Sequence, residues 1–238
     1  MLNKFFDKIY LLNLKKDKKR LINSIRVSKE IGFKFELFEA THWSSFEVKN
    51  IIKDKGLFGH THMTPGAIGC SYSHVQIIKD AILKKYKNIL ILEDDVLPSK
   101  NFKKILSDLY IPSDYNFLYL GGNLDGRKDF LIDYDDIFFK STNIAGTYAW
   151  SINENVYEKC IFEISKFSDT ADRSLAILHD KHPDFTYILK DQLFLPNIFD
   201  DSNIRNLKDI NFKINWFKRM GFSYRDIHYK FRKDIPRF

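Results

Sequence analysis

NILILEDDV, residues 88–96, joins four aliphatic residues directly to Glu93, Asp94 and Asp95. An apolar run without polar alternation is typical of a strand covered on both faces, as in a parallel sheet between helices. Acids at the end of such a strand would lie in the crevice beyond the strand tips, where open α/β sheets bind their ligands. These nine residues therefore predict an α/β fold with a mainly parallel sheet flanked by helices.

The three acids also predict a kind of site. Adjacent carboxylates raise one another's pKa unless a cation neutralises them. Their oxygen atoms suit Mg²⁺ or Mn²⁺, especially where the ion also holds a phosphate. The structural alternative is that acids after a strand cap the next helix or form a turn. We expect a divalent-metal site for a phosphorylated ligand.

Length and composition set the class of protein. The chain has 238 residues, of which 44% are hydrophobic and 16% aromatic, which suits one ordered α/β domain or a domain with a small appendage. No run approaches the roughly 20 apolar residues of a membrane span, and Asp7 and Lys8 interrupt any signal-like apolar core. Cys70 and Cys160 lack metal-ligand spacing, so we expect buried free thiols in a reducing, cytoplasmic setting.

The net charge of +7 is concentrated at one end of the chain. Residues 205–238 hold ten Lys/Arg and three Asp/Glu, whereas residues 1–204 hold 28 of each sign. We therefore divide the chain into a domain at 1–204 and a basic, aromatic C-terminal segment at 205–238. Such a segment suits the anionic inner face of a membrane, so peripheral association is one expectation. Packing of its aromatic residues on the domain is the alternative, and nucleic acid is a weaker one.

Periodicity and end signals predict alternating strands and helices, which favours a parallel sheet. Strands are expected at 8–14, 34–40, 88–93, 116–120 (closed by two glycines), 147–152 and within 185–195. Helices are expected after Asp17, after Ser44 or Ser45, from Pro65, at 101–110, at 153–166 and after Asp169 or Thr170. Residues 133–140 look irregular, and His60 and His62 fall in a loop expected to lie over a ligand.

Four blocks resemble one known family. They are KIYLLNL at 8–14 with Arg20 beyond it, GAIGCSYSH at 66–74, ILEDDV at 91–96 and AGTYAW at 145–150. They are similar to the opening strand, the G-E-I-G-C-x-x-S-H helix start, the L-E-D-D block and the G-T-x-G-Y strand of glycosyltransferase family 25. The chain departs from the second pattern in having Ala67 in place of Glu.

The resemblance implies a GT-A-like, Rossmann-like fold and a metal-dependent transferase. The donor would be a UDP-sugar, with galactose the family's common choice, and the cofactor Mn²⁺ or Mg²⁺. The acceptor would be a glycan or a lipid-linked oligosaccharide, as in lipopolysaccharide biosynthesis.

Candidate roles follow for residues in these blocks. We assign metal contact to Asp95, with Asp94 as a second ligand or ribose partner and Glu93 as a ligand or an orienter of metal-bound water. Asn13 and Arg20 should lie near the nucleotide, although Arg20 could equally be a solvated helix charge.

Two further roles are assigned to residues outside the acidic block and the first strand. Ser71 or His74 should face the donor, although a lone His is more often a structural hydrogen-bonding residue. An inverting transferase also needs a general base near the acceptor hydroxyl, for which we select Asp172. Asp169 is the nearest rival for that role and could instead cap the helix.

Other functions use similar sequence features. A haloacid-dehalogenase-type phosphatase also carries Asp residues after a strand, but it needs a spacer between them that Asp94 and Asp95 lack. A non-catalytic glycan-binding or scaffold protein could keep the fold without turnover. A basic tail could also bind nucleic acid, which we do not expect here.

Overall fold

The computed structural model describes residues 1–56, 63–123, 128–197, 215, 218, 224–228, 230 and 231. Its α-helices are α1 (Lys18–Ile31), α2 (Phe46–Lys55), α3 (Pro65–Leu83), α4 (Phe102–Asp108), α5 (Tyr157–Ile164) and α6 (Ala171–Lys181). Its strands are β1 (Lys8–Asn13), β2 (Glu36–Glu39), β3 (Asn88–Glu93), β4 (Val96–Pro98), β5 (Phe117–Asn123), β6 (Leu131–Asp133), β7 (Phe138–Ser141), β8 (Ala145–Asn153), β9 (Thr186–Leu189) and β10 (Phe194–Pro196).

The main sheet has the strand order β2-β1-β3-β8-β5-β9-β7-β6. β1 pairs in parallel with β2 and β3, and β5 pairs in parallel with β9. β8 runs antiparallel between β3 and β5, and β7 runs antiparallel beside β9. All the main strands except β7 and β8 therefore point the same way, which confirms the predicted mainly parallel α/β sheet. The antiparallel insertion of β8 was not predicted from its sequence.

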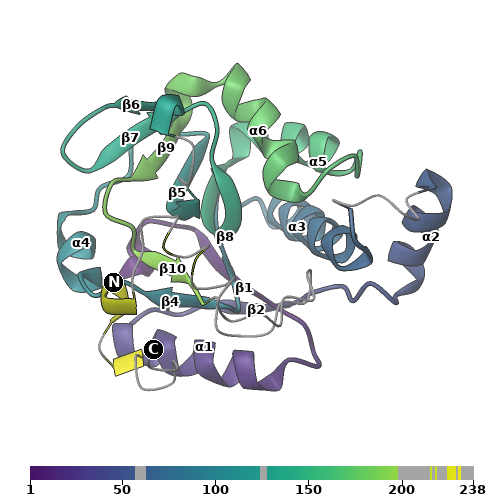
Figure 1. Ribbon diagram of the computed structural model, residues 1–238, viewed down its shortest axis with the longest axis horizontal. Coiled ribbons are helices and arrows are strands. Elements are labelled where there is room, and N and C mark those ends of the chain that lie inside the picture. The colour runs from purple at the N-terminus through teal and green to yellow at the C-terminus, as the bar shows by residue number, and fades with distance from the viewer. Residues whose placement is uncertain are drawn as a thin grey trace.

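Helices cover both faces of this sheet, as Figure 1 shows, with α1 on one side and α3, α5 and α6 on the other. Alternate residues of β3 supply the two layers. Leu90 and Leu92 belong to the core shared with α1 and α4, and Ile89 and Ile91 to the core shared with α3, α5 and α6. All four are fully buried, as an uninterrupted apolar strand requires.

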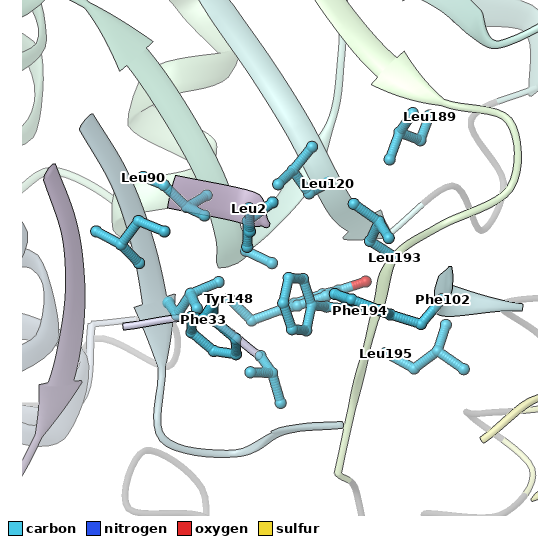
Figure 2. Packing of buried hydrophobic residues seen from close by; sticks show 14 of the residues in the cluster. Leu2, Phe33, Leu90, Phe102, Leu120, Tyr148, Leu189, Leu193, Phe194 and Leu195 are labelled. Carbon is cyan, nitrogen blue, oxygen red and sulfur yellow. The ribbon is translucent and has the colours of Figure 1, made fainter. Parts of the chain in front are cut away.

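The core on the α1 side also collects segments far apart in the chain. Figure 2 shows Leu2, Phe33, Phe102 and Phe194 packed around it. Phe194 makes edge-on contacts with the rings of Phe33 and Phe102. The small sheet of β4 and β10 therefore closes this side of the domain.

Local signals place most helix ends where the sequence predicts them. Gly32 ends α1 in the left-handed conformation, with φ of 77°. Ser45 caps α2 by accepting a hydrogen bond from the Val48 amide, and Thr64 caps α3 ahead of Pro65. These caps settle the choice between Ser44 and Ser45.

Two expectations were wrong. The glycines after residue 120 do not close the strand, because β5 continues through Gly121 and Gly122. The Gln192 side chain accepts from the Gly122 amide and donates to its carbonyl, thereby replacing a strand partner. The segment predicted to be irregular contains the β6–β7 hairpin. Its short strands, with exposed alternate residues, leave only a weak periodic signal.

Part of the C-terminal segment packs on the domain. Ile227 and Phe231 are buried in the core on the α1 side, and the guanidinium of Arg26 lies over the Phe231 ring. His60, His62 and most of residues 205–238 lie outside the described residues. No helix among those described has the length and apolar character needed to cross a membrane.

Candidate active site

The carboxyl ends of β1 and β3 bring the first candidate residues together. The two strands pair in parallel with Leu12 opposite Glu93, so Asn13 and Asp94 leave the sheet side by side. The Asn13 side-chain amide donates a 2.6 Å hydrogen bond to Asp94. This is the edge at which open α/β sheets bind ligands.

Asp94 is the centre of a buried polar cluster. Its second carboxylate oxygen accepts a 2.7 Å hydrogen bond from Arg20 Nη1, and its backbone carbonyl accepts one from Ser24. Burial raises the pKa of the Asp94 carboxyl above its ordinary value, and the positive charge of Arg20 opposes that shift. Arg20 is therefore an ion-pair partner within the site, not a solvated helix charge.

Asp95 also faces Arg20, with 3.6 Å between its carboxylate oxygen and Nη1. The Asp95 carboxylate is more exposed than that of Asp94, at 28% against 8% of the side-chain surface. Both acids line a pocket at this edge of the sheet. The remaining lining residues are Leu12, Leu14, Lys16, Arg20, Ala40, Thr41, His42, Trp43, Gly66, Cys70, Ser73 and Glu93.

The opposite wall of the pocket is the loop after β2. The Thr41 amide donates a 2.8 Å hydrogen bond to Ser73 Oγ, which in turn donates to the Gly69 carbonyl. A Cβ added at Gly69 would lie 2.8 Å from the Thr41 carbonyl oxygen. The loop and α3 therefore touch backbone to backbone, and Trp43, still 46% exposed, is held at the pocket.

Glu93 is held from two other elements. Thr147 on β8 donates a 3.1 Å hydrogen bond to Glu93 Oε1, and His74 Nε2 on α3 lies 3.4 Å from the same oxygen. Cys160 is buried as predicted, whereas Cys70, on the pocket wall near this carboxylate, is half-buried. The pKa of Cys70 is raised by burial and by the nearby acids, first Glu93 and then Asp172.

Asp172 lies in the first turn of α6 and is tied to the start of β8. Its carboxylate accepts a 3.0 Å hydrogen bond from the Gly146 amide and a 2.5 Å one from the Thr170 hydroxyl. Gly146 precedes Thr147, which contacts Glu93, so neighbouring residues of β8 touch the two acids. Asp169 instead accepts from the Thr170 amide and pairs with Arg173.

The structure thus groups Asn13, Arg20, Glu93, Asp94 and Asp95. His74 lies behind Glu93 and is fully buried, and Ser71 is buried outside the residues that line the pocket.

Sequence reasoning did not identify three contributors, namely Cys70, Thr147 and the loop carrying Trp43. The first two lie inside blocks that resemble the family's motifs, and that position was the available signal. The loop after β2 has no motif of its own.

Comparisons with known proteins agree with this fold. The profile of glycosyltransferase family 25, described as LPS biosynthesis protein, matches residues 6–130. No curated protein matches the chain. A crystal structure of a glycosyltransferase involved in the glycosylation of the major capsid of PBCV-1 superposes with a TM-score of 0.50 at 12% identity, covering 91% of this chain and 98% of that one. A197 from STIV gives a TM-score of 0.40 at 13% identity, covering 78% and 81%. At this identity the first likeness concerns the fold alone, which is the predicted GT-A-like one.

Proposed function

Because the chain belongs to glycosyltransferase family 25, we propose that it transfers a sugar from a UDP-sugar to a glycan or lipid-linked oligosaccharide. The observation that supports this most is the carboxylate-lined pocket at the ends of β1 and β3. A nucleotide-sugar carries a diphosphate, and a divalent cation would offset the repulsion between that group and the carboxylates of the pocket. Galactose is the first donor sugar to test.

The donor set at the pocket fits Mn²⁺ or Mg²⁺. Glu93 and Asp95 both line it, and carboxylate oxygens are the ligands these ions prefer. A bound divalent ion would offset the negative charge that develops on the departing diphosphate. We assign Asp95 and Glu93 as its main ligands, with Thr147 orienting the Glu93 carboxylate.

Asp94 has a different task in this proposal. Both of its oxygens already accept hydrogen bonds, from Asn13 and Arg20. It therefore fixes the guanidinium of Arg20 at the pocket, where Arg20 can contact a phosphate. Any direct contact of Asp94 with metal or ribose would add to these bonds.

In an inverting transfer, the hydroxyl group of the sugar acceptor must lose its proton to a general base. We propose Asp172 for that role. Its carboxylate is held by Gly146, one residue from the Thr147 that contacts Glu93. A carboxylate that accepts two hydrogen bonds is well oriented. Asp169, which accepts from the Thr170 amide and pairs with Arg173, is less suited.

The half-exposed ring of Trp43 offers a surface for the uracil base at the other end of the pocket. Aromatic rings stack on bases, with about 1–3 kcal/mol per base in single-stranded nucleic acid. The acceptor side would then lie toward β8 and α6. A peripheral position at an anionic membrane remains a proposal for the basic C-terminal segment.

The test is release of UDP from a panel of UDP-sugars with Mn²⁺, Mg²⁺ or a chelator, in the presence of glycan acceptors. We expect Asp95→Asn to lower metal-dependent turnover by about 100-fold or more, since it removes an electrostatic contact made to the transition state. Asp180→Asn, an exposed change on α6, is the matched control and should leave turnover unchanged. Metal-independent UDP affinity with no turnover for any sugar would favour a non-catalytic glycan-binding protein instead.

A further inference from the structure

One cluster beside the pocket carries a chemistry that sugar transfer does not need. Cys70, His74 and Glu93 each offer one ligand atom, and the three atoms lie within 4.8 Å of one another. They supply a thiol, an imidazole and a carboxylate. Mn²⁺ and Mg²⁺ prefer oxygen, whereas sulfur and imidazole nitrogen suit zinc.

His74 gives an independent indication of a ligand. Its side chain is fully buried, and neither ring nitrogen has a hydrogen-bond partner among the described residues. Buried polar atoms nearly always have partners, and an exception calls for a specific cause. The Nε2 atom points at Glu93, 3.4 Å from its carboxylate oxygen, in a geometry that does not form a hydrogen bond.

The spacing agrees with a shared metal ion. Two ligands at about 2.0–2.1 Å from a tetrahedral zinc ion lie about 3.3 Å apart, close to the separation of His74 and Glu93. A sulfur and a nitrogen on the same ion would be about 3.6 Å apart. Cys70 and His74 are four residues apart on α3 and share one helix face, and Cys70 faces the pocket. Zinc binding would draw together three ligand atoms that now lie within 4.8 Å of one another, and the Cys70 sulfur would move by rotation about the Cα–Cβ bond.

We propose that Cys70, His74 and Glu93 form a three-ligand site for Zn²⁺, with the fourth position open to the pocket. This arrangement of three protein ligands and one open position is common in non-structural zinc sites. This site has Glu93 in common with the carboxylate site assigned above to Mn²⁺ or Mg²⁺, but its other two ligands are different. Zinc bound here would withdraw Glu93 from the transfer site, so it would inhibit the proposed transfer.

Cobalt titration tests the binding directly, because Co²⁺ replaces Zn²⁺ and a Co²⁺–thiolate bond absorbs in the near ultraviolet. We expect one equivalent of Co²⁺ to give this band in the reduced full-length protein and zinc to abolish it. Cys70→Ser should eliminate the band. Cys160→Ser is the matched control, because Cys160 is the other free cysteine and is buried in α5, and the band should persist. No band in the unmodified protein, or a band that survives Cys70→Ser, overturns the proposal.

Zinc affinity gives a second readout that does not depend on a thiolate spectrum. Competition with a chromophoric chelator should show zinc binding at least about tenfold weaker in Cys70→Ser and in His74→Asn than in the unmodified protein. Circular dichroism and thermal melting would establish that each variant is folded. If His74→Asn does not fold, the comparison of Cys70→Ser with Cys160→Ser decides alone. Equal affinities in those two cysteine variants contradict the site.

The inhibition rests on the proposed function, whereas the metal titrations need no sugar nucleotide. In Mn²⁺ assays, zinc should lower UDP release, and each variant should be compared with its own zinc-free rate. Cys70→Ser should need at least about tenfold more zinc for the same fractional loss. An unchanged zinc requirement in that variant refutes the inhibition, while absence of turnover in every sample would refute the proposed function alone.

Discussion

The Asp94 carboxylate at this site is both buried and paired with a positive charge. It is 8% exposed and has Arg20 as an ion-pair partner at 2.7 Å. The pKa is nevertheless raised, because burial disfavours the charged form more than Arg20 and Asn13 favour it. A pKa perturbed by burial and by a specific charged partner is common at functional sites.

The raised pKa of Asp94 predicts a particular pH dependence of stability. Between the unfolded and folded pKa values the native state binds more protons, so this group's contribution to stability falls as pH rises. The melting temperature of the unmodified protein minus that of Asp94→Asn should therefore increase when pH is lowered from 7 through the range in which Asp residues titrate. A difference that shrinks on acidification would indicate that the ion pair with Arg20 dominates.

At the scale of elements, the contact between α3 and the loop after β2 sets one wall of the pocket. Ser73 bonds the Thr41 amide and the Gly69 carbonyl, and no Cβ fits at Gly69. Ser73→Ala should leave the half-buried Thr41 amide without its side-chain partner, at a cost of about 1–3 kcal/mol. We expect weaker UDP binding by calorimetry together with a lower free energy of unfolding.

Ser107→Ala is the control for this change, because the exposed Ser107 hydroxyl bonds only residues near it on α4. That variant should match the unmodified protein in both measurements. UDP affinity unchanged in Ser73→Ala would show that the loop does not depend on α3 for its position at the pocket.

A second contact between elements occurs where β5 passes β8 and β10. A Cβ on Gly121 would lie 2.5 Å from the Phe194 carbonyl and 2.6 Å from the Tyr148 ring. Gly121→Ala should lower the free energy of unfolding by about 1–3 kcal/mol through overpacking, measured by urea denaturation. Gly56→Ala is a useful comparison, since its Cβ meets nothing within 4 Å and only the left-handed backbone, with φ of 62°, is strained. A smaller loss at Gly121 than at Gly56 would argue against close packing of these strands.

At the scale of the whole molecule, residues from the two ends of the chain pack in the same hydrophobic core. Ile227 and Phe231 belong to a segment set apart by its charge, yet they share a core with Leu2 and Phe102. Phe231→Ala should lower the free energy of unfolding by about 3–5 kcal/mol, as expected for a large buried ring. Phe162→Ala on α5, where the ring is 65% exposed, should change it by no more than about 0.5 kcal/mol. Equal effects of the two changes would mean that the C-terminal segment does not stabilise the domain.

The parts of the molecule that could be predicted are those with a strong local pattern. The buried strand at 88–93, the helix starts near Ser45 and at Pro65 and the acids after β3 all follow from neighbouring residues. The antiparallel place of β8 could not be predicted, since pairing direction depends on which strands meet and not on composition. The contact of Thr147 with Glu93 is likewise long-range, because the two residues are 54 positions apart in the sequence.

Two neighbouring residues at the start of β8 contact two acids of the candidate site. Gly146 bonds Asp172 and the next residue, Thr147, bonds Glu93, so adjacent residues of β8 hold both the proposed base and a proposed metal ligand. The relative position of the two acids therefore depends on the start of β8 and on α6, which carries Asp172. Under the proposed function, loops that contact the acceptor could be exchanged around these two residues while the positions of Asp172 and Glu93 are preserved.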